Sequence, residues 1–91
     1  HHKKIRFFLF FPSILNEFTV HSGSSEPGSQ KVTSEKVSIL KTLDWIDKNH
    51  MIIGEKEIVN LIICIHGIEG LSHRVIFFLL KKVVETLASE S

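Results

Sequence analysis

The stretch from Val32 to His50 constrains the fold more than any other part of the chain, because it is amphipathic along its whole length. Thr33 and Ser34 are residue types that cap helix N-termini, and apolar residues follow them at helical spacing. The pattern predicts a helix that ends near Asn49. One arc of this helix should face the core, and it comprises Ile39, Leu40, Leu43 and Ile46.

Trp45 does not belong to that arc. It lies between Lys41 and Lys48 at positions i, i+4 and i+7, so a large aromatic side chain shares a helix face with two cations. Large aromatic side chains are more often buried than displayed. Trp45 is therefore expected either to lie under another element or to form part of a binding surface.

Length and composition indicate one folded domain. The chain has 91 residues, of which 43% are hydrophobic and 23% charged, so global disorder is not expected. His1 and His2 resemble the end of a purification tag, which leaves residues 3–91 as the domain. A net charge of +1 is too small for a polycation, so bare nucleic acid is not an obvious partner, because tight phosphate binding needs several concentrated cations.

The single cysteine and the lengths of the apolar runs indicate the cellular location of the protein. Cys64 cannot form an internal disulfide, and it lies in an apolar run, where we expect a buried hydrophobe in a reducing, intracellular protein. No apolar run reaches the ~20 residues that span a bilayer, so no membrane partner is expected. The run before Pro12 resembles a secretory signal peptide. The tag-like histidines ahead of it favour a deliberately placed start of the chain over a signal peptide.

The N-terminal region suggests a β-hairpin. The aromatic run Ile5–Phe11 is typical of a strand, and Glu17–His21 alternates apolar and polar residues like a returning antiparallel strand. A short helical turn at residues 13–18 is the alternative. Residues 22–30, rich in glycine and serine, should form a flexible surface loop.

Two further helices are predicted in the C-terminal half. Glu55–His66 is apolar around most of its circumference and should be the buried central helix, although its β-branched residues would also suit a buried strand. Gly67 should end it, and Ser72 should cap a helix from His73 to Leu87. The core arc of this last helix comprises Ile76, Leu79, Leu80, Val83, Val84 and Leu87. The tail from Ala88 should fray. The expected fold is α+β, with an N-terminal β-hairpin packed on a small bundle of three main α-helices.

The last helix repeats the pattern around Trp45. Arg74, Phe78 and Lys81 fall at i, i+4 and i+7 on the side away from its apolar arc. If both basic and aromatic stripes lie on one side of the bundle, they form a positive surface with aromatic anchors, suited to an acidic protein segment. Alternatively, the two aromatic residues cover the hairpin and the cations are solvated.

No catalytic or metal site is expected. Cys64 and His66 are two residues apart on a predicted helix and point in different directions, which disfavours zinc coordination with His50 or His73. No cation or helix N-terminus would activate the cysteine as a nucleophile. The glycines do not form a phosphate-binding motif. We therefore expect no enzyme and no cofactor.

The order of features from Ile5 to Asn49 resembles the C-terminal domain of rhabdovirus phosphoproteins, especially the vesiculovirus type. The resemblance covers about half of the chain and rests on Glu17, Phe18, Val20, Gly23, Gly28, Ser34, Glu35, Lys36, Ile39 and Leu40. It implies a module that docks on the viral nucleoprotein–RNA complex and, through the rest of a parent chain, tethers the large polymerase subunit. Its location would be the host cell cytoplasm or the virion. The loop is longer here, and the region after Asn49 does not align, which leaves the family's binding face unassigned.

The predicted protein-binding residues come from two sources. Lys36 is the one cation matched by the resemblance, and the others come from the two stripes: Lys41, Trp45, Lys48, Arg74, Phe78 and Lys81. Two other functions stay open. Glu55–Leu87 is compatible with a small helical nucleic-acid-binding domain, and the run Ile5–Phe11 or Trp45 is compatible with a homo-oligomeric module.

Overall fold

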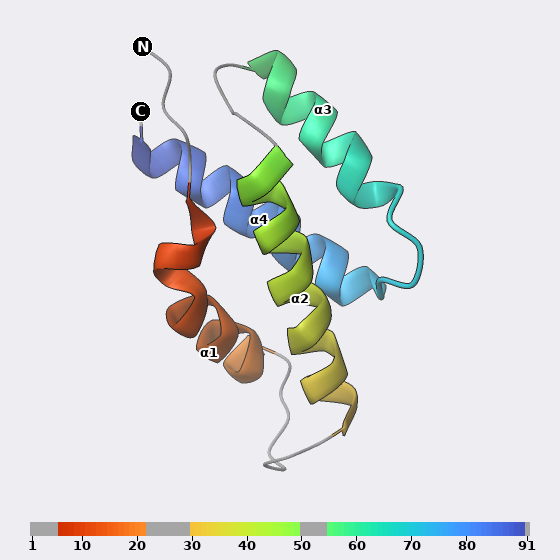
Figure 1. Cartoon of the computed structure of the whole chain (residues 1–91). Coiled ribbons are helices and arrows are strands. Elements are labelled where there is room, and N and C mark those ends of the chain that lie inside the picture. The colour runs from red at the N-terminus through yellow and green to blue at the C-terminus, as the bar shows by residue number, and fades with distance from the viewer. Residues whose placement is uncertain (1–5, 22–29, 50–54, 91) are drawn as a thin grey trace.

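The computed structural model describes residues 6–21, 30–49 and 55–90, and these form a helical domain (Figure 1). The elements, in chain order, are the 3-10 helix η1 (Phe7–Phe10) and the α-helices α1 (Phe11–His21), α2 (Gln30–Asn49), α3 (Glu55–His66) and α4 (His73–Glu90). The described residues contain no strand. The fold is therefore all-α.

The predicted N-terminal β-hairpin is wrong. Phe7–Phe10 coil into η1, and the proposed return strand Glu17–His21 is the second half of α1. The alternation at residues 17–21 is outweighed by a longer helical pattern, in which Phe7, Ile14 and Phe18 are the buried residues. The alternative of a helical turn at residues 13–18 comes closer to the observed helix.

Pro12 begins a helix here instead of interrupting a strand. It is the second residue of α1, where a missing backbone N–H leaves no helical hydrogen bond unmade. The residue that suggested a hairpin loop therefore marks the first turn of α1.

The other helices agree better with the sequence. α3 spans the predicted residues, and α4 begins at His73 as expected but continues to Glu90, beyond the predicted end at Leu87. α2 begins at Gln30, so Thr33 and Ser34 lie inside the helix and not at its cap. The predicted loop at residues 22–30 falls outside the described residues except for Gln30.

The central helix is α2 and not α3. α2 contacts η1, α1 and α4, whereas α3 packs mainly on α4 and fully buries only Leu61 and Ile65. Figure 1 shows α4 passing behind α2, with α1 and α3 on either side. The many apolar residues of α3 therefore do not make it the core helix, since Val59 and Ile63 face solvent.

The core forms where α2 crosses α1 and α4. Three of the four residues predicted for the α2 arc are fully buried, whereas Leu40 is exposed. On α4, Leu79 and Val83 are fully buried and Val84 is exposed. The core cluster comprises Phe7, Ile14, Phe18, Ile39, Leu43, Ile46, Leu61, Ile65, Val75, Ile76, Phe78, Leu79 and Val83.

A buried carboxylate joins the N-terminal segment to α2. The backbone N–H groups of Phe7 and Phe8 donate hydrogen bonds to Oδ1 and Oδ2 of Asp47, at 2.8 and 2.9 Å. These amides open η1, so Asp47 caps an element that lies about forty residues earlier in the sequence. Hydrogen bonds to a charged group contribute roughly 1.5–3 kcal/mol each.

We predict that Asp47→Ala lowers the free energy of unfolding by about 2–3 kcal/mol, because it leaves two amides at the start of η1 without a partner. Urea denaturation followed by circular dichroism measures this. Asp44→Ala is the matched control. It removes only the exposed pair with Lys48 and should cost less than about 0.5 kcal/mol. Equal losses for the two variants would contradict the capping role.

Candidate functional site

Trp45 lies at a hollow in the surface of the domain. Its exposed fraction is 36%, and the hollow beside it has a volume of about 290 Å³. The walls are Lys41, Thr42 and Trp45 of α2 and Ile68, which belongs to the turn after α3. We call this surface, together with Lys48 one turn further along α2, the Trp45 face.

The two lysines of the Trp45 face are exposed, and Lys48 forms only a weak ion pair. Lys48 Nζ lies 2.9 Å from Asp44 Oδ2, in an exposed i, i+4 pair of a kind that contributes only a few tenths of a kcal/mol. Lys41 is exposed and forms no ion pair with another residue that the structure describes. The face therefore carries positive charge next to an aromatic side chain.

The second predicted stripe is engaged within the domain. Phe78 is buried against Phe18 of α1, with ring centroids 5.1 Å apart and planes at 67°. The Arg74 guanidinium lies 5.7 Å from the centroid of the same Phe18 ring. The alternative in which Phe78 covers another element is thus the observed one, with helix α1 in place of the hairpin.

Lys81 and Lys36 also lie apart from the Trp45 face. Lys81 Nζ is 3.8 Å from a Glu17 carboxylate oxygen and 3.9 Å from one of Glu85. Lys36 is half-buried on α2 and precedes Trp45 by nine residues, which is two and a half helical turns. The two residues therefore project from opposite sides of α2. Of the predicted binding residues, the structure brings together Lys41, Trp45 and Lys48.

Arg74 belongs to a partly buried polar network centred on the buried Glu35. Arg74 Nε donates to Oε2 and Oε1 of Glu35, at 2.9 and 3.1 Å, and its Nη2 also bonds to this carboxylate. The Ser72 hydroxyl donates to Glu35 Oε2 at 2.8 Å and accepts the Val75 N–H at 3.3 Å. The prediction that Ser72 caps α4 is confirmed, and the cap is in turn held by α2.

The network lowers the pKa of Glu35. Hydrogen bonds from Arg74 have the largest effect, burial opposes them, and the Ser72 hydroxyl adds to the lowering. Sequence reasoning missed this role of Glu35, although a signal was present. Glu35 lies on the arc of α2 that carries Ile39, Leu43 and Ile46, where a charge indicates a buried pair.

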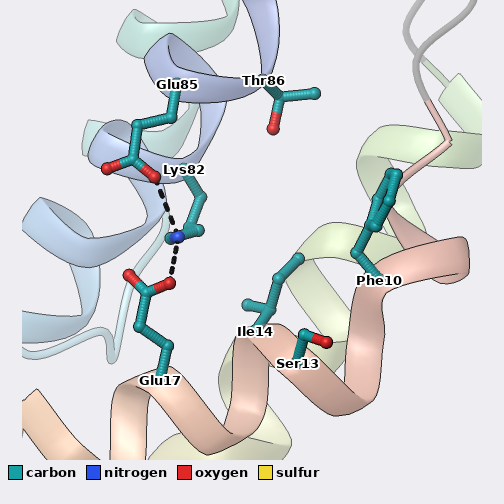
Figure 2. A pocket seen from close by; sticks show the side chains of 7 residues that line it. All are labelled: Phe10, Ser13, Ile14, Glu17, Lys82, Glu85 and Thr86. Carbon is teal, nitrogen blue, oxygen red and sulfur yellow. Dashed lines mark hydrogen bonds and ion pairs between the residues drawn. The ribbon is translucent and has the colours of Figure 1, made fainter. Parts of the chain in front are cut away.

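A second ionic cluster joins α1 to α4. Lys82 Nζ lies 2.5 Å from Glu17 Oε1 and 2.9 Å from Glu85 Oε1. Burial by itself would lower the pKa of Lys82, but the hydrogen bonds to Glu17 and Glu85 outweigh it and raise this pKa. The cluster borders a groove of about 390 Å³ between the two helices (Figure 2). We call it the α1–α4 groove. It is lined by Phe10, Ser13, Ile14, Glu17, Lys82, Glu85 and Thr86.

The other candidate chemistry does not assemble in the part of the chain that the structure describes. No group of three or more histidine, cysteine, aspartate or glutamate side chains is placed there to hold a metal ion, and His50 lies outside this part. Cys64 is exposed on α3, so the prediction that it is buried is wrong. Among the described helices, none has the length and apolar character needed to cross a bilayer.

Comparisons with known proteins leave the family open. No family model matches the chain, and neither the curated proteins nor the solved structures contain a significant match to it. Glu17, Phe18 and Val20, which carry part of the resemblance to rhabdovirus phosphoproteins, lie in α1 and not in a strand. Gly23 and Gly28 lie outside the described residues, and the resemblance stays a prediction.

We predict that the Glu35 network makes the stability of the domain pH-dependent. Because the pKa of Glu35 is lowered in the folded state, its contribution is fully present above the ordinary glutamate pKa of about 4.3. The contribution is lost as the pH falls through the lower folded-state pKa. Glu35→Gln should cost about 1–3 kcal/mol at pH 7, and the difference from wild type should shrink towards pH 3.

Denaturant titrations at several pH values between 7 and 3 measure this difference. Glu69→Gln, at an exposed glutamate in the turn before α4, is the matched control and should follow the wild-type curve. A difference between Glu35→Gln and wild type that stays constant over the whole range would contradict the assignment.

Proposed function

We propose that this domain is a non-catalytic protein-binding module and that its partner binds the Trp45 face. The observation that carries the proposal is Trp45 itself, 36% exposed at a hollow and flanked by two lysines. Tryptophan is enriched at the energetic centres of protein interfaces, because it offers a large apolar area and one hydrogen-bond donor.

The face suits a partner segment that combines acidic and apolar side chains. Lys41 and Lys48 would attract carboxylates and increase the rate of encounter. An apolar side chain of the partner would then enter the hollow between Trp45 and Ile68. The pair between Lys48 and Asp44 is exposed and weak, so Lys48 can exchange Asp44 for a carboxylate of the partner at low cost.

The resemblance to rhabdovirus phosphoproteins supplies a first partner to test, the viral nucleoprotein bound to RNA. In that role the domain would contact the nucleoprotein and not read bases, and the large polymerase subunit would be reached through the rest of the parent chain. The Trp45 face supports docking on protein, since its few cations surround an aromatic side chain and do not form an extended basic track.

We predict that replacing Lys41 and Lys48 together by glutamate weakens binding to the nucleoprotein–RNA complex at least tenfold, because attraction becomes repulsion on both sides of Trp45. A pull-down titration at fixed ionic strength measures the affinity, and circular dichroism should show unchanged helicity. The matched control replaces Lys31 and Lys56, exposed lysines elsewhere, by glutamate. Equal affinities for the two double variants would contradict the proposed face. Binding of wild type to RNA alone would instead favour a nucleic-acid-binding domain.

We also predict that Trp45→Ala weakens the same binding by a factor of ten or more, since the partner loses its apolar anchor. Trp45 is the only tryptophan, so its fluorescence reports on this face alone. In the wild-type domain, an acidic peptide with a central leucine should shift the emission to shorter wavelength as the indole loses water. An unchanged spectrum at saturating peptide would contradict docking next to Trp45.

A further inference from the structure

A second surface of the domain displays large apolar side chains. Phe8, Leu9 and Phe10 of η1 are 49%, 63% and 52% exposed, and we call them the apolar triad. Half-exposed side chains of this size leave on the order of 300 Å² of apolar surface open in total. The three side chains project in different directions around η1, and exposed apolar side chains of this size in one short segment are candidates for contact with a partner.

The triad belongs to η1, a helical segment that is anchored to α2. Phe7, which precedes it, is fully buried, and Asp47 accepts the hydrogen bonds of the Phe7 and Phe8 amides. The side chains of the triad thus project from a segment that is anchored to α2. A partner that covers them needs to order little additional backbone, which lowers the entropic cost of binding.

The triad lies next to a hollow that could receive such side chains. Phe10 is itself one wall of the α1–α4 groove, and Ile14 is another apolar part of its lining. Figure 2 shows Phe10, Ser13 and Ile14 on one side of the groove, with Lys82, Glu85 and Thr86 of α4 on the other. An apolar projection and an apolar hollow therefore share one surface, as a two-fold interface between identical chains requires.

The charges around this surface also fit a second copy of the chain. Arg6, directly before the triad, is exposed and forms no ion pair with a described residue. At the groove, the Glu85 carboxylate is half-exposed, and a carboxylate has acceptor sites beyond those that Lys81 and Lys82 occupy. In a two-fold arrangement, Arg6 of each copy can meet Glu85 of the other while Phe8 or Leu9 enters the groove beside Phe10.

We infer that the apolar triad and the α1–α4 groove form a symmetric interface between two copies of this chain. The triad alone falls short of the roughly 800 Å² per partner of a stable interface. The two-fold arrangement buries a triad and a groove on each copy, which brings the area towards that value. The interface shares no residue with the Trp45 face, so dimer formation and partner binding are separable.

The first test is the oligomeric state of the whole chain, measured by sedimentation equilibrium from micromolar to millimolar concentration. We expect wild type to be in a concentration-dependent monomer–dimer equilibrium. Replacing Phe8 and Leu9 by serine should weaken the dimer at least tenfold with unchanged helicity, because both side chains already face solvent in the monomer. Phe77→Ser removes an aromatic side chain of α4 that is even more exposed than Phe8 and should leave the dimer unchanged.

The second test exchanges charges between copies. Arg6→Glu and Glu85→Arg should each weaken the dimer, because every copy then meets a like charge. Because Glu85 also pairs with Lys81 and Lys82 within the monomer, circular dichroism must first show that Glu85→Arg keeps wild-type helicity. An equimolar mixture of the two variants should recover a dimer close to wild type, since both contacts again join opposite charges. A wild-type chain that stays monomeric, a dimer that survives the triad variant, or a mixture no tighter than its components would each overturn the inference.

Discussion

Two buried carboxylates on α2 fix the arrangement of the domain. Glu35 holds Ser72 and Arg74 at the start of α4, and Asp47 holds the first amides of η1. A buried carboxylate is costly without partners, so each of these two sites favours a single placement of the element it binds. The apolar residues between them supply the burial, but such contacts are non-directional and would tolerate several arrangements. The two carboxylates thus specify how η1 and α4 are placed on α2, which apolar packing alone would leave open.

The sequence predicted those parts of the fold that depend on local signals. The bounds of α3 and the start of α4 follow from acidic first-turn residues, Gly67 and the Ser72 cap, all of which act within a few residues. The N-terminal segment failed because an unbroken run such as Phe7–Phe11 has no periodicity that separates strand from helix. Its helical start is capped by Asp47, about forty residues away in the sequence, and Phe7 packs in the core. The spacing of apolar residues within one segment carries no information about hydrogen bonds to a residue so distant in the sequence.

The candidate site, too, could be predicted only where local signals determine it. The basic and aromatic pattern occurs twice with identical spacing, yet Phe78 packs on Phe18 while Trp45 borders an open hollow. Phe78 is covered because α1 packs against α4 through Phe18 and Glu17. Because α1 was expected to be a strand, the sequence could not indicate which stripe it would cover. It did single out Trp45, whose position outside the apolar arc of its own helix was a local property.

The position of Ile68 has a consequence for how the hollow beside Trp45 behaves. Three of its walls belong to α2, the most heavily anchored helix, whereas Ile68 follows α3, which fully buries only two side chains. One side of the hollow is therefore set by the packing of α2 and the other by the packing of α3 on α4, so the shape of the hollow depends on two separate helix contacts.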